Sequence, residues 1–466
     1  MKPLCVDLDG TLIRTDLLFE SFISHCKKNP FSIFKLTYYF FKSKSLLKSK
    51  LSGSNSIDVE NLPYCPDVLA FLKEESKRRD LILVTGSNII YAQKVANHLR
   101  IFQGVIASSE DINLTGSRKA KHLEAKYGLK GFDYVGNCSH DVPVWKSSHK
   151  GYSVVKNNWG LDNVDILPIK KNRFNFNVLT KLLRIHQWAK NILIFVPLIL
   201  SHQFNSATNI MLALKAFISF CLMASSVYIL NDILDVENDR KHPEKRFRPI
   251  PSGDIQLPIA ITAFVLLSTS SVFMSLQLNS WTLALYPLFY LVLNLFYSAY
   301  LKQLLIVDIC VLTSFYLIRL FYGGAATGFE LSYWMVSFSF FIFFSLAVIK
   351  RYIEIHKLFH LQGRKSSTGR AYQFDDMPIL LGIGIATGIA SVIVLSLYFQ
   401  FGAKQELYSN PKYLWGIEVL ILVWICNIWV RAVRGKVDDD PVKFALTDKF
   451  SLVTAGFIVI LGMMAV

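Results

Sequence analysis

The feature that most constrains this chain is a series of long apolar stretches, which begins near Ile185 and continues to the C-terminus. A helix needs roughly 20 apolar residues to cross the hydrocarbon core of a bilayer. About nine stretches come near this length, and they cover residues 189–204, 208–230, 257–277, 279–298, 303–322, 332–349, 378–400, 412–431 and 449–466. We therefore expect residues 181–466 to form an all-α polytopic membrane domain of about nine transmembrane helices.

The first third of the chain has the ordinary mixture of charged and apolar residues that soluble domains show. Short apolar runs separated by helical patterns predict a parallel sheet with covering helices. These runs are Leu4–Val6, Leu81–Val84, Gly104–Ala107 and Tyr134–Gly136. We expect an α/β, Rossmann-like domain over residues 1–165 and a linker over residues 166–180.

Residues 27–51 interleave lysines with aromatic side chains. Such a segment can form part of a helical cap over an active site. We expect this cap to cover about residues 15–70. The segment can also lie on an anionic membrane surface, and the two roles are compatible.

Charge predicts how the chain is oriented in the membrane. Lysines and arginines gather before the first apolar stretch and after the second, fourth, sixth and eighth, whereas the intervening loops carry few. By the positive-inside rule, the basic connections and the N-terminus face the cytosol. Residues Met1–Leu4 lead directly into an apolar strand, so we expect no signal peptide and a first domain that stays in the cytosol.

Composition also narrows the classes of function. The net charge is +16, but no nucleic-acid-binding motif accompanies it, and 52% of the residues are hydrophobic. Membrane loops and phosphate-bearing substrates are therefore the leading explanation of the positive charge. The seven cysteines are scattered without C-x-x-C pairing, which argues against a disulfide framework or a structural zinc site.

The first candidate site follows the first apolar run, in the segment C-V-D-L-D-G-T-L. Its two carboxylates, Asp7 and Asp9, stand at a strand end, where one can attack phosphorus and the other can donate and accept a proton. Both can also reach a magnesium ion. Gly10 permits a tight turn with backbone N–H groups near a phosphate.

These residues resemble the D-x-D-G-T motif of the HAD superfamily, and the later motifs of that family follow in order. Thr85 in V-T-G-S would hydrogen-bond the phosphoryl group, and Lys119 would neutralise it, with Lys121 as the competing candidate. The segment G-N-C-S-H-D places Asn137 and Asp141, which would complete a magnesium site with Asp7 and Asp9. The family commonly has Asp at position 137, and Asn lowers the negative charge there but keeps an oxygen ligand. The resemblance implies hydrolysis of a phosphate monoester through an aspartyl-phosphate at Asp7, although a degenerate scaffold without catalysis stays open.

The second candidate site lies at the end of the second apolar stretch, in the segment N-D-I-L-D-V-E-N-D. Asp232, Asp235 and Asp239 are spaced three and four apart, so on a helix they project from one face. Carboxylates at the end of a membrane helix are costly unless something compensates them. Hard oxygen ligands suit magnesium, which in turn binds diphosphate.

This pattern resembles the aspartate-rich motif of the UbiA prenyltransferase superfamily, and within it the chain looks most similar to the decaprenyl-phosphate phosphoribosyltransferases (DPPR synthases). The second aspartate motif of the aromatic prenyltransferases is reduced here to Asp308. The segments that carry the resemblance are His186–Asn191, Asp239–Gly253, Asp308–Cys310, Tyr316–Arg319, Gly323–Thr327 and Lys350–Tyr352.

The resemblance implies phosphoribosyl pyrophosphate as donor, polyprenyl phosphate as acceptor, and a magnesium ion held by Asp232, Asp235 and Asp239. An acceptor phosphate is already anionic near neutral pH, so no strong general base is required. Candidates for binding the substrate phosphates are Lys190, Asn231, Lys245, Arg246, Arg248, Lys302, Arg319 and Lys350. Each of the cations can instead serve orientation or packing, but Arg319 lies within an apolar stretch, where a functional or paired role is favoured.

Together the motifs predict a bifunctional enzyme of the cytoplasmic membrane. The membrane domain would make a phosphoribosylated lipid, and the HAD domain would remove its 5-phosphate on the cytosolic side, giving polyprenyl phosphoryl ribose as a precursor for a cell-envelope glycan. An aromatic prenyltransferase with a regulatory HAD domain, a phosphatase acting on an unrelated monoester, and a nonenzymatic membrane scaffold are the alternatives. The oligomeric state stays open, a homo-oligomer included.

Overall fold

The structure, a computed structural model, describes most of the chain. The described residues are 1–29, 32, 35–36, 38–39, 51, 57–109, 114–168, 176–201, 206–362, 370–402, 408–437 and 440–466. Most of the lysine- and aromatic-rich segment at 27–51, which we interpreted as a cap or membrane-surface segment, lies outside them.

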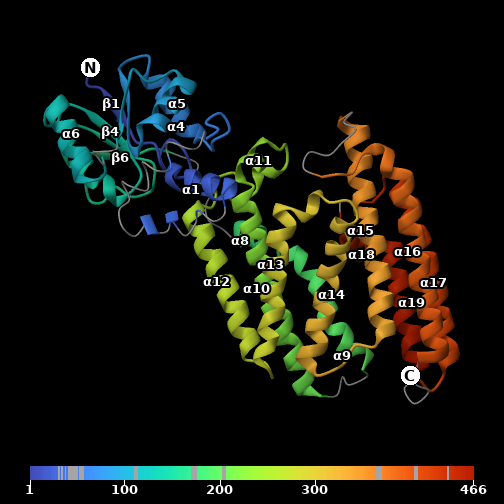
Figure 1. The fold of residues 1–466 in the computed structure, drawn as a ribbon. Helices are drawn as coiled ribbons and strands as arrows, with labels where there is room; N and C mark the ends of the chain where they lie inside the picture. The colour runs from blue at the N-terminus through green and yellow to red at the C-terminus, as the bar shows by residue number, and fades with distance from the viewer. Residues whose placement is uncertain are drawn as a thin grey trace. The chain divides into compact units, whose positions relative to one another are not determined.

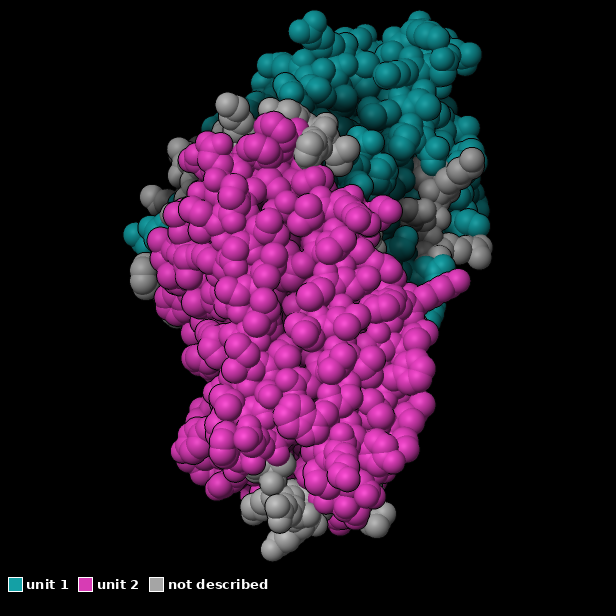
Figure 2. Space-filling model, turned by 90° about the vertical axis from the view of Figure 1, so that its right-hand side faces the viewer, with its two compact units in different colours: residues 1–184, 228–265 teal, residues 185–227, 266–466 magenta. Residues whose placement is uncertain are grey.

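The chain forms two compact units, and neither is a single continuous stretch of sequence (Figure 2). The first unit contains residues 1–184 and 228–265, and the second contains 185–227 and 266–466. Helix α10 (Ala207–Leu234) runs through the boundary between them. The expected domains, in contrast, were continuous, with all residues after 180 in the membrane part.

The first unit contains a six-stranded parallel sheet with the order β3-β2-β1-β4-β5-β6 (Figure 1). Four strands confirm the predicted runs: β1 (Leu4–Val6), β2 (Leu81–Asn88), β3 (Gly104–Ser108) and β4 (Asp133–Gly136). Two short strands, β5 (Gly151–Ser153) and β6 (Val164–Ile166), extend the sheet beyond β4. Since β1 lies between β2 and β4, the carboxyl ends of these three strands meet at one edge of the sheet.

Side chains along the strands alternate between two apolar clusters, because successive residues of a strand point to opposite faces. Leu4 and Val6 pack into one cluster with helices α1 (Leu17–Lys28), α4 (Pro66–Glu75) and α5 (Ile89–Leu99). Cys5 points to the other cluster, beside α6 (Ser117–Tyr127) and α7 (Val142–Ser147). The sheet is therefore buried on both faces, as parallel sheets usually are.

The second unit and the ends of the first contain the long apolar helices. Among the described residues, seven helices are long and apolar enough to cross a membrane, or eight if the pair α18–α19 is one bent span. They are Ala207–Leu234, Leu257–Leu276, Trp281–Ala299, Val307–Thr327, Tyr333–Phe359, Phe374–Phe401 and Pro411–Val433, with Pro441–Thr447 plus Lys449–Ala465 as the bent pair. Only 17% of the apolar window in Leu257–Leu276 is buried by protein, so its surface requires lipid. The chain is a multi-pass membrane protein.

Within the described ranges, the structure thus contains fewer candidate spans than the nine that we expected. The first predicted span, 189–204, corresponds to a 3-10 helix at Ile185–Phe195 followed by the short helix α9 (Val196–Leu200). Together they form a short apolar helix, Ile185–Leu200, that falls below the length of a span. The composition of this stretch suits a membrane, but 3-10 geometry seldom persists for long and Pro197 begins a new helix rather than continuing the first.

Candidate functional site

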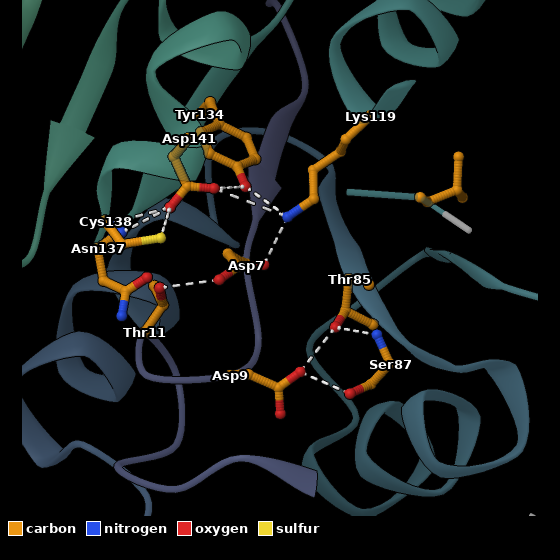
Figure 3. Close-up of polar contacts among 12 residues, drawn as sticks. Asp7, Asp9, Thr11, Thr85, Ser87, Lys119, Tyr134, Asn137, Cys138 and Asp141 are labelled. Atoms are coloured by element: carbon orange, nitrogen blue, oxygen red, sulfur yellow. Dashed lines mark hydrogen bonds and ion pairs between the residues drawn. The ribbon is translucent and has the colours of Figure 1, made fainter. Parts of the chain in front are cut away.

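The first cluster of predicted site residues gathers at the carboxyl edge of the sheet (Figure 3). Asp7 directly follows β1, and Asp9 lies in the turn after it. Thr85 belongs to the end of β2, whereas Asn137 and Asp141 follow β4. Parallel strands thus bring together three motifs that are far apart in the sequence.

Lys119 of α6 is the cation at the centre of this cluster. Its Nζ lies 2.7 Å from Asp7 Oδ1 and 3.7 Å from Asp141 Oδ1, and it donates to the hydroxyl of Tyr134 at 2.9 Å. Its side chain is 7% exposed. Lys121 is exposed, so the structure favours Lys119 of the two candidates. A lysine this deeply buried is tolerable because carboxylates surround it.

Hydroxyl groups and one backbone N–H donate hydrogen bonds to the carboxylates of Asp9 and Asp141. Ser87 and Thr85 donate to Asp9 Oδ2 at 2.6 and 3.2 Å, and the backbone N–H of Leu17 donates to Asp9 Oδ1 at 2.9 Å. Tyr134 donates to Asp141 Oδ1 at 2.7 Å. Thr85, which we predicted to contact a phosphoryl group, therefore binds Asp9 here.

Burial of several carboxylates around one lysine changes their proton affinity. Burial raises the pKa of Asp7 to about 7, with Asp141 adding to the rise and Lys119 opposing it. Burial, with the nearby charge of Asp16, raises the pKa of Asp9 to about 6. For Lys119, burial alone would lower the pKa, but Asp7 and Asp141 outweigh it and raise the pKa. The cluster carries more negative than positive charge and would accept a further cation.

The donor set suits magnesium by its chemistry. Asp7, Asp9 and Asp141 offer carboxylate oxygens, and Asn137 offers an amide oxygen. The amide of Asn137 lies against Gly10, where a Cβ would stand only 2.2 Å from its Nδ2. Within the described part of the chain, however, no three acidic, His or Cys side chains already converge as a metal-ligand set. The carboxylates instead face Lys119 and the hydroxyls.

The second cluster lies where α10 ends and α11 (Val236–Lys241) begins. Arg248 bridges two of the predicted carboxylates, with its Nη1 3.0 Å from Asp232 Oδ1 and 2.7 Å from Asp239 Oδ2. Arg184 forms a second ion pair with Asp232, and Lys245 lies 3.9 Å from Asp239. Both carboxylates are buried, and guanidinium groups compensate their charge.

Asp235 stands slightly apart from Asp232 and Asp239. Helix α10 ends at Leu234, and the backbone at Asp235 leaves helical geometry, with φ −99° and ψ 9°. The Asp235 side chain pairs with Lys27 at 3.4 Å and is 44% exposed. Prediction from the spacing assumed one unbroken helix, so the break explains why the three aspartates do not share one face.

The second cluster also has the chemistry to hold a cation. Burial raises the pKa of Asp239; Arg248 and Lys245 oppose the rise, and Asp232 and Asp235 add to it. Crowded carboxylates fit a magnesium–diphosphate group, provided that Arg248 turns from the aspartates toward the phosphates.

Three of the remaining substrate-binding candidates lie buried or paired in the second unit. Lys190 forms an ion pair with Asp440. Burial alone would raise the pKa of Asp440, but Lys190 and Lys350 outweigh it and lower the pKa, which places the two lysines around one carboxylate. Arg319 donates to Asn191 at 2.7 Å and lies over the ring of Phe220, so its charge is satisfied by packing partners.

The other three candidates are scattered. Arg246 is exposed and stacks over the ring of Phe247. Asn231 belongs to the last turn of α10, and its backbone carbonyl accepts from Asp235. Lys302 lies in a short 3-10 helix at Leu301–Gln303. Among the described residues, neither Arg246 nor Lys302 forms an ion pair with Asp232 or Asp239.

Sequence reasoning missed four polar residues of these clusters. Tyr134 reads as part of an apolar strand, and Ser87 follows Thr85 without a motif of its own. Arg184 appeared only as one of the basic residues before the first span. Asp440 lies far along the chain from Lys190, and nothing in its local sequence predicts the pairing.

Comparisons with known proteins concern the whole chain and its membrane part. The model of the UbiA prenyltransferase family matches residues 192–453. The protein y4nM of Sinorhizobium fredii is 33% identical over 460 residues, which cover 96% of this chain and 88% of y4nM, so that similarity extends through the N-terminal residues as well.

Two further similarities are confined to the C-terminal part or to the fold. Decaprenyl-phosphate phosphoribosyltransferase of Mycobacterium tuberculosis is 38% identical over 180 residues, which cover 38% of this chain and 59% of that enzyme. A solved UbiA homolog from Archaeoglobus fulgidus, bound to DMAPP and Mg2+, is 16% identical with a TM-score of 0.47, covering 61% of this chain and 98% of its own.

Proposed function

Because the chain belongs to the UbiA prenyltransferase family, we propose that it transfers 5-phosphoribose from phosphoribosyl pyrophosphate to a polyprenyl phosphate. We further propose that the N-terminal domain is a HAD-type phosphatase, which removes the 5-phosphate to leave polyprenyl phosphoryl ribose. The observation that supports this most is the presence of two carboxylate–cation clusters in one compact unit, around Asp7 and around Asp232. The similarity to the mycobacterial phosphoribosyltransferase supports the choice of donor and acceptor.

In the transfer reaction, an anionic oxygen of the acceptor phosphate attacks C1 of the ribose, and the bond from C1 to pyrophosphate breaks. Asp232 and Asp239 would hold magnesium, with Asp235 and Glu237 within the same segment as further donors. Arg248 and Arg184, now paired with the carboxylates, would turn to the pyrophosphate oxygens. Lys190 and Lys350 are candidates for a second phosphate group of the substrates.

In the hydrolytic reaction, Asp7 attacks phosphorus, and the bond from phosphorus to the ribose 5-oxygen breaks. Asp9 gives its proton to the departing oxygen, then takes one from the water that hydrolyses the aspartyl-phosphate. A pKa near 6 leaves Asp9 partly protonated near neutral pH, which suits both roles. Lys119 neutralises the phosphoryl oxygens beside Asp7. Magnesium, where bound, would neutralise the charge that develops on the departing diphosphate or on the transferred phosphoryl group.

We propose that both reactions take place at the cytosolic face of the cytoplasmic membrane. The basic loops support this orientation through the positive-inside rule. The presence of the N-terminal sheet and residues 228–265 in one unit supports a shared compartment for the two clusters.

The test is an assay of membranes with labelled phosphoribosyl pyrophosphate, polyprenyl phosphate and magnesium, in which the labelled lipids are identified by mass. We expect lipid-linked ribose without the 5-phosphate from the natural protein, and its 5-phosphorylated form from Asp7→Asn. Labelled lipid that keeps the 5-phosphate in both proteins would refute the phosphatase step alone. An active, folded preparation that labels no lipid would refute the phosphoribosyl transfer, and isoprenyl diphosphate with aromatic acceptors would then distinguish the aromatic prenyltransferase.

A further inference from the structure

One buried ion pair joins segments of the first unit that are 220 residues apart. Arg240 of α11 donates to both carboxylate oxygens of Glu20 on α1, at 2.6 and 3.2 Å (Figure 1 shows both helices). The two side chains are 5% and 2% exposed. Neither residue belongs to the carboxylate clusters described above.

Each partner is also fixed by a second hydrogen bond. Thr15 donates to Glu20 at 2.6 Å, and Nε of Arg240 donates to the carbonyl oxygen of Pro251 at 3.1 Å. A bidentate, fully hydrogen-bonded pair of this kind holds two elements in one register. A buried charge without its partner is unfavourable, so each residue depends on the other.

Weaker contacts join the segment around Arg240 to other parts of the N-terminal domain. Lys241 pairs with Asp58 at 2.8 Å, and Arg14 lies 3.8 Å from Asp254. Gly253 has a φ of +75°, and a Cβ there would stand 2.5 Å from Cβ of Arg14. The backbone of the loop after α11 therefore lies directly against the turn that connects Asp9 to α1.

Helix α1 has a second role, because it borders the Asp7–Asp9 cluster. Its first residue, Leu17, donates its N–H to Asp9. A small hollow beside Asp9 is lined on one side by α1 and on the other by the end of β2 and the start of α5; the lining residues are Leu17, Leu18, Ser21, Ser87, Asn88 and Tyr91. The hollow has room for only about one water molecule, so α1 packs closely beside Asp9 and its neighbours.

We infer that Arg240 is a positioning residue for the hydrolytic site, which acts through Glu20 by holding α1 beside Asp9. The segment that carries the transferase carboxylates would thereby shape the surroundings of the hydrolytic site. This inference rests on the proposed phosphatase activity for its catalytic consequence, whereas the placement of α1 rests on the contacts alone. Arg240 itself touches no reacting atom.

The first measurement is hydrogen exchange of the full-length protein in detergent, because it does not depend on catalysis. Arg240→Gln leaves Glu20 buried without its cation, and we expect the amides of Leu17–Lys28 to exchange about tenfold faster or more. Lys241→Gln is the matched control, since it removes the adjacent ion pair from α11 to the loop before α4. The Lys241 side chain is 57% exposed, so exchange in α1 should change less than about twofold. Exchange of α1 that stays within about twofold in Arg240→Gln would overturn the inference.

The second measurement is steady-state hydrolysis of p-nitrophenyl phosphate with magnesium. For Arg240→Gln we expect KM to rise about fivefold to tenfold and kcat to fall less than about threefold, because Asp7 and Lys119 lie on other elements and α1 contacts Asp9 through a single N–H. Arg240→Lys, which keeps the charge but loses the bidentate contact, should be intermediate. Faster exchange in α1 with an unchanged KM would also overturn the positioning role.

A double variant separates lost positioning from general unfolding. Glu20→Met with Arg240→Met removes both charges together, so α1 should recover most of its protection and KM should return toward the natural value. No recovery would contradict a role carried by the ion pair. If the natural protein hydrolysed no ester, the proposed phosphatase would fail, and the exchange results would still decide whether Arg240 holds α1.

Discussion

The two carboxylate clusters of the first unit use the same chemistry but are assembled in different ways. At the sheet edge, Lys119 and Asp7 are 112 residues apart in sequence. At the end of α10, Arg248 is only 9 residues from Asp239 and 16 from Asp232. The first cluster therefore exists only when the whole sheet has formed, whereas the second is supplied largely by one local segment.

The clusters also differ in charge balance. At the sheet edge, burial raises the pKa values of Asp7 and Asp9 to about 7 and 6, and one buried lysine partly opposes the rise at Asp7. At the helix end, Arg248, Arg184 and Lys245 lie beside two buried aspartates. The comparison teaches that a site short of cations binds and releases protons near neutral pH, and a site rich in cations is prepared for phosphate groups.

The largest expected effect comes from removing one carboxylate from each cluster, because each removal should sharply reduce a different activity. Asp7→Asn removes the proposed nucleophile and should reduce ester hydrolysis about 10³-fold or more, with lipid labelling retained. Asp232→Ala should reduce labelling about 10²- to 10⁴-fold and leave hydrolysis of a small ester within about threefold. Both activities are measured on the same purified protein. Loss of both activities in either variant, at normal folding, would show that the clusters are not separate sites.

The next largest expected effect is a loss of local stability when one cation is removed from each cluster. Lys119→Met leaves buried carboxylates unpaired and should lower the free energy of opening at β1 by about 3–5 kcal/mol at neutral pH. Arg184→Met should cost about 1 kcal/mol at α11, because Asp232 keeps Arg248 and Arg184 is 19% exposed. Native-state hydrogen exchange at each element gives both values. Equal losses would contradict the difference in charge balance.

A smaller effect concerns pH in the absence of magnesium. The folded pKa values of Asp7 and Asp9 lie above the ordinary 3.8, so between about pH 4 and 7 the folded state binds more protons than the unfolded state. Stability must then fall as pH rises through this range, by about 1–3 kcal/mol at β1. Added magnesium should flatten the slope, and Asp9→Asn should reduce it. Stability of β1 that instead rises from pH 5 to 7 would refute the raised pKa values.

The smallest expected effect comes from removing the Tyr134 hydroxyl, which belongs to the sheet-edge cluster. Tyr134→Phe keeps the ring but removes the group that accepts from Lys119 and donates to Asp141. We expect a loss of about 1–2 kcal/mol in opening free energy at β4 and a decrease in hydrolysis of less than about tenfold. Tyr127→Phe, in the same unit but outside the cluster, is the control and should change little. A Tyr134→Phe protein as stable as the control would mean that the hydroxyl contributes nothing.

Much of the fold of the first unit could be predicted because its central strands are continuous apolar runs. β1 to β4 were recognised in this way, but β5 and β6 have only three residues each, G-Y-S and V-D-I, which give no periodic signal. In the membrane part, composition predicted the long helices well. It could not distinguish a span from the 3-10 helix and short α-helix at Ile185–Leu200, because hydropathy does not report backbone geometry.

The arrangement of a site could be predicted where its residues belong to motifs that follow one another in a known order. Asp7, Lys119 and Asp141 gather as the resemblance implied, but the choice between Lys119 and Lys121 needed the structure, because a helix turns neighbouring positions to different faces. The partners Arg184 and Tyr134 could not be predicted, since a contact between distant residues leaves no local pattern. The placement of Asp235 failed on a local break in the helix, which spacing alone does not show.

The division of the first unit into residues 1–184 and 228–265 has a consequence for biosynthesis. Glu20 leaves the ribosome 220 residues before Arg240, a delay of about 10–45 s at ordinary rates of synthesis. During that interval the N-terminal sheet can form, but helix α1 still lacks its partner. The sheet-edge cluster could therefore assemble early, whereas the contact that holds α1 could form only after α10 and the segment that follows it have been synthesised.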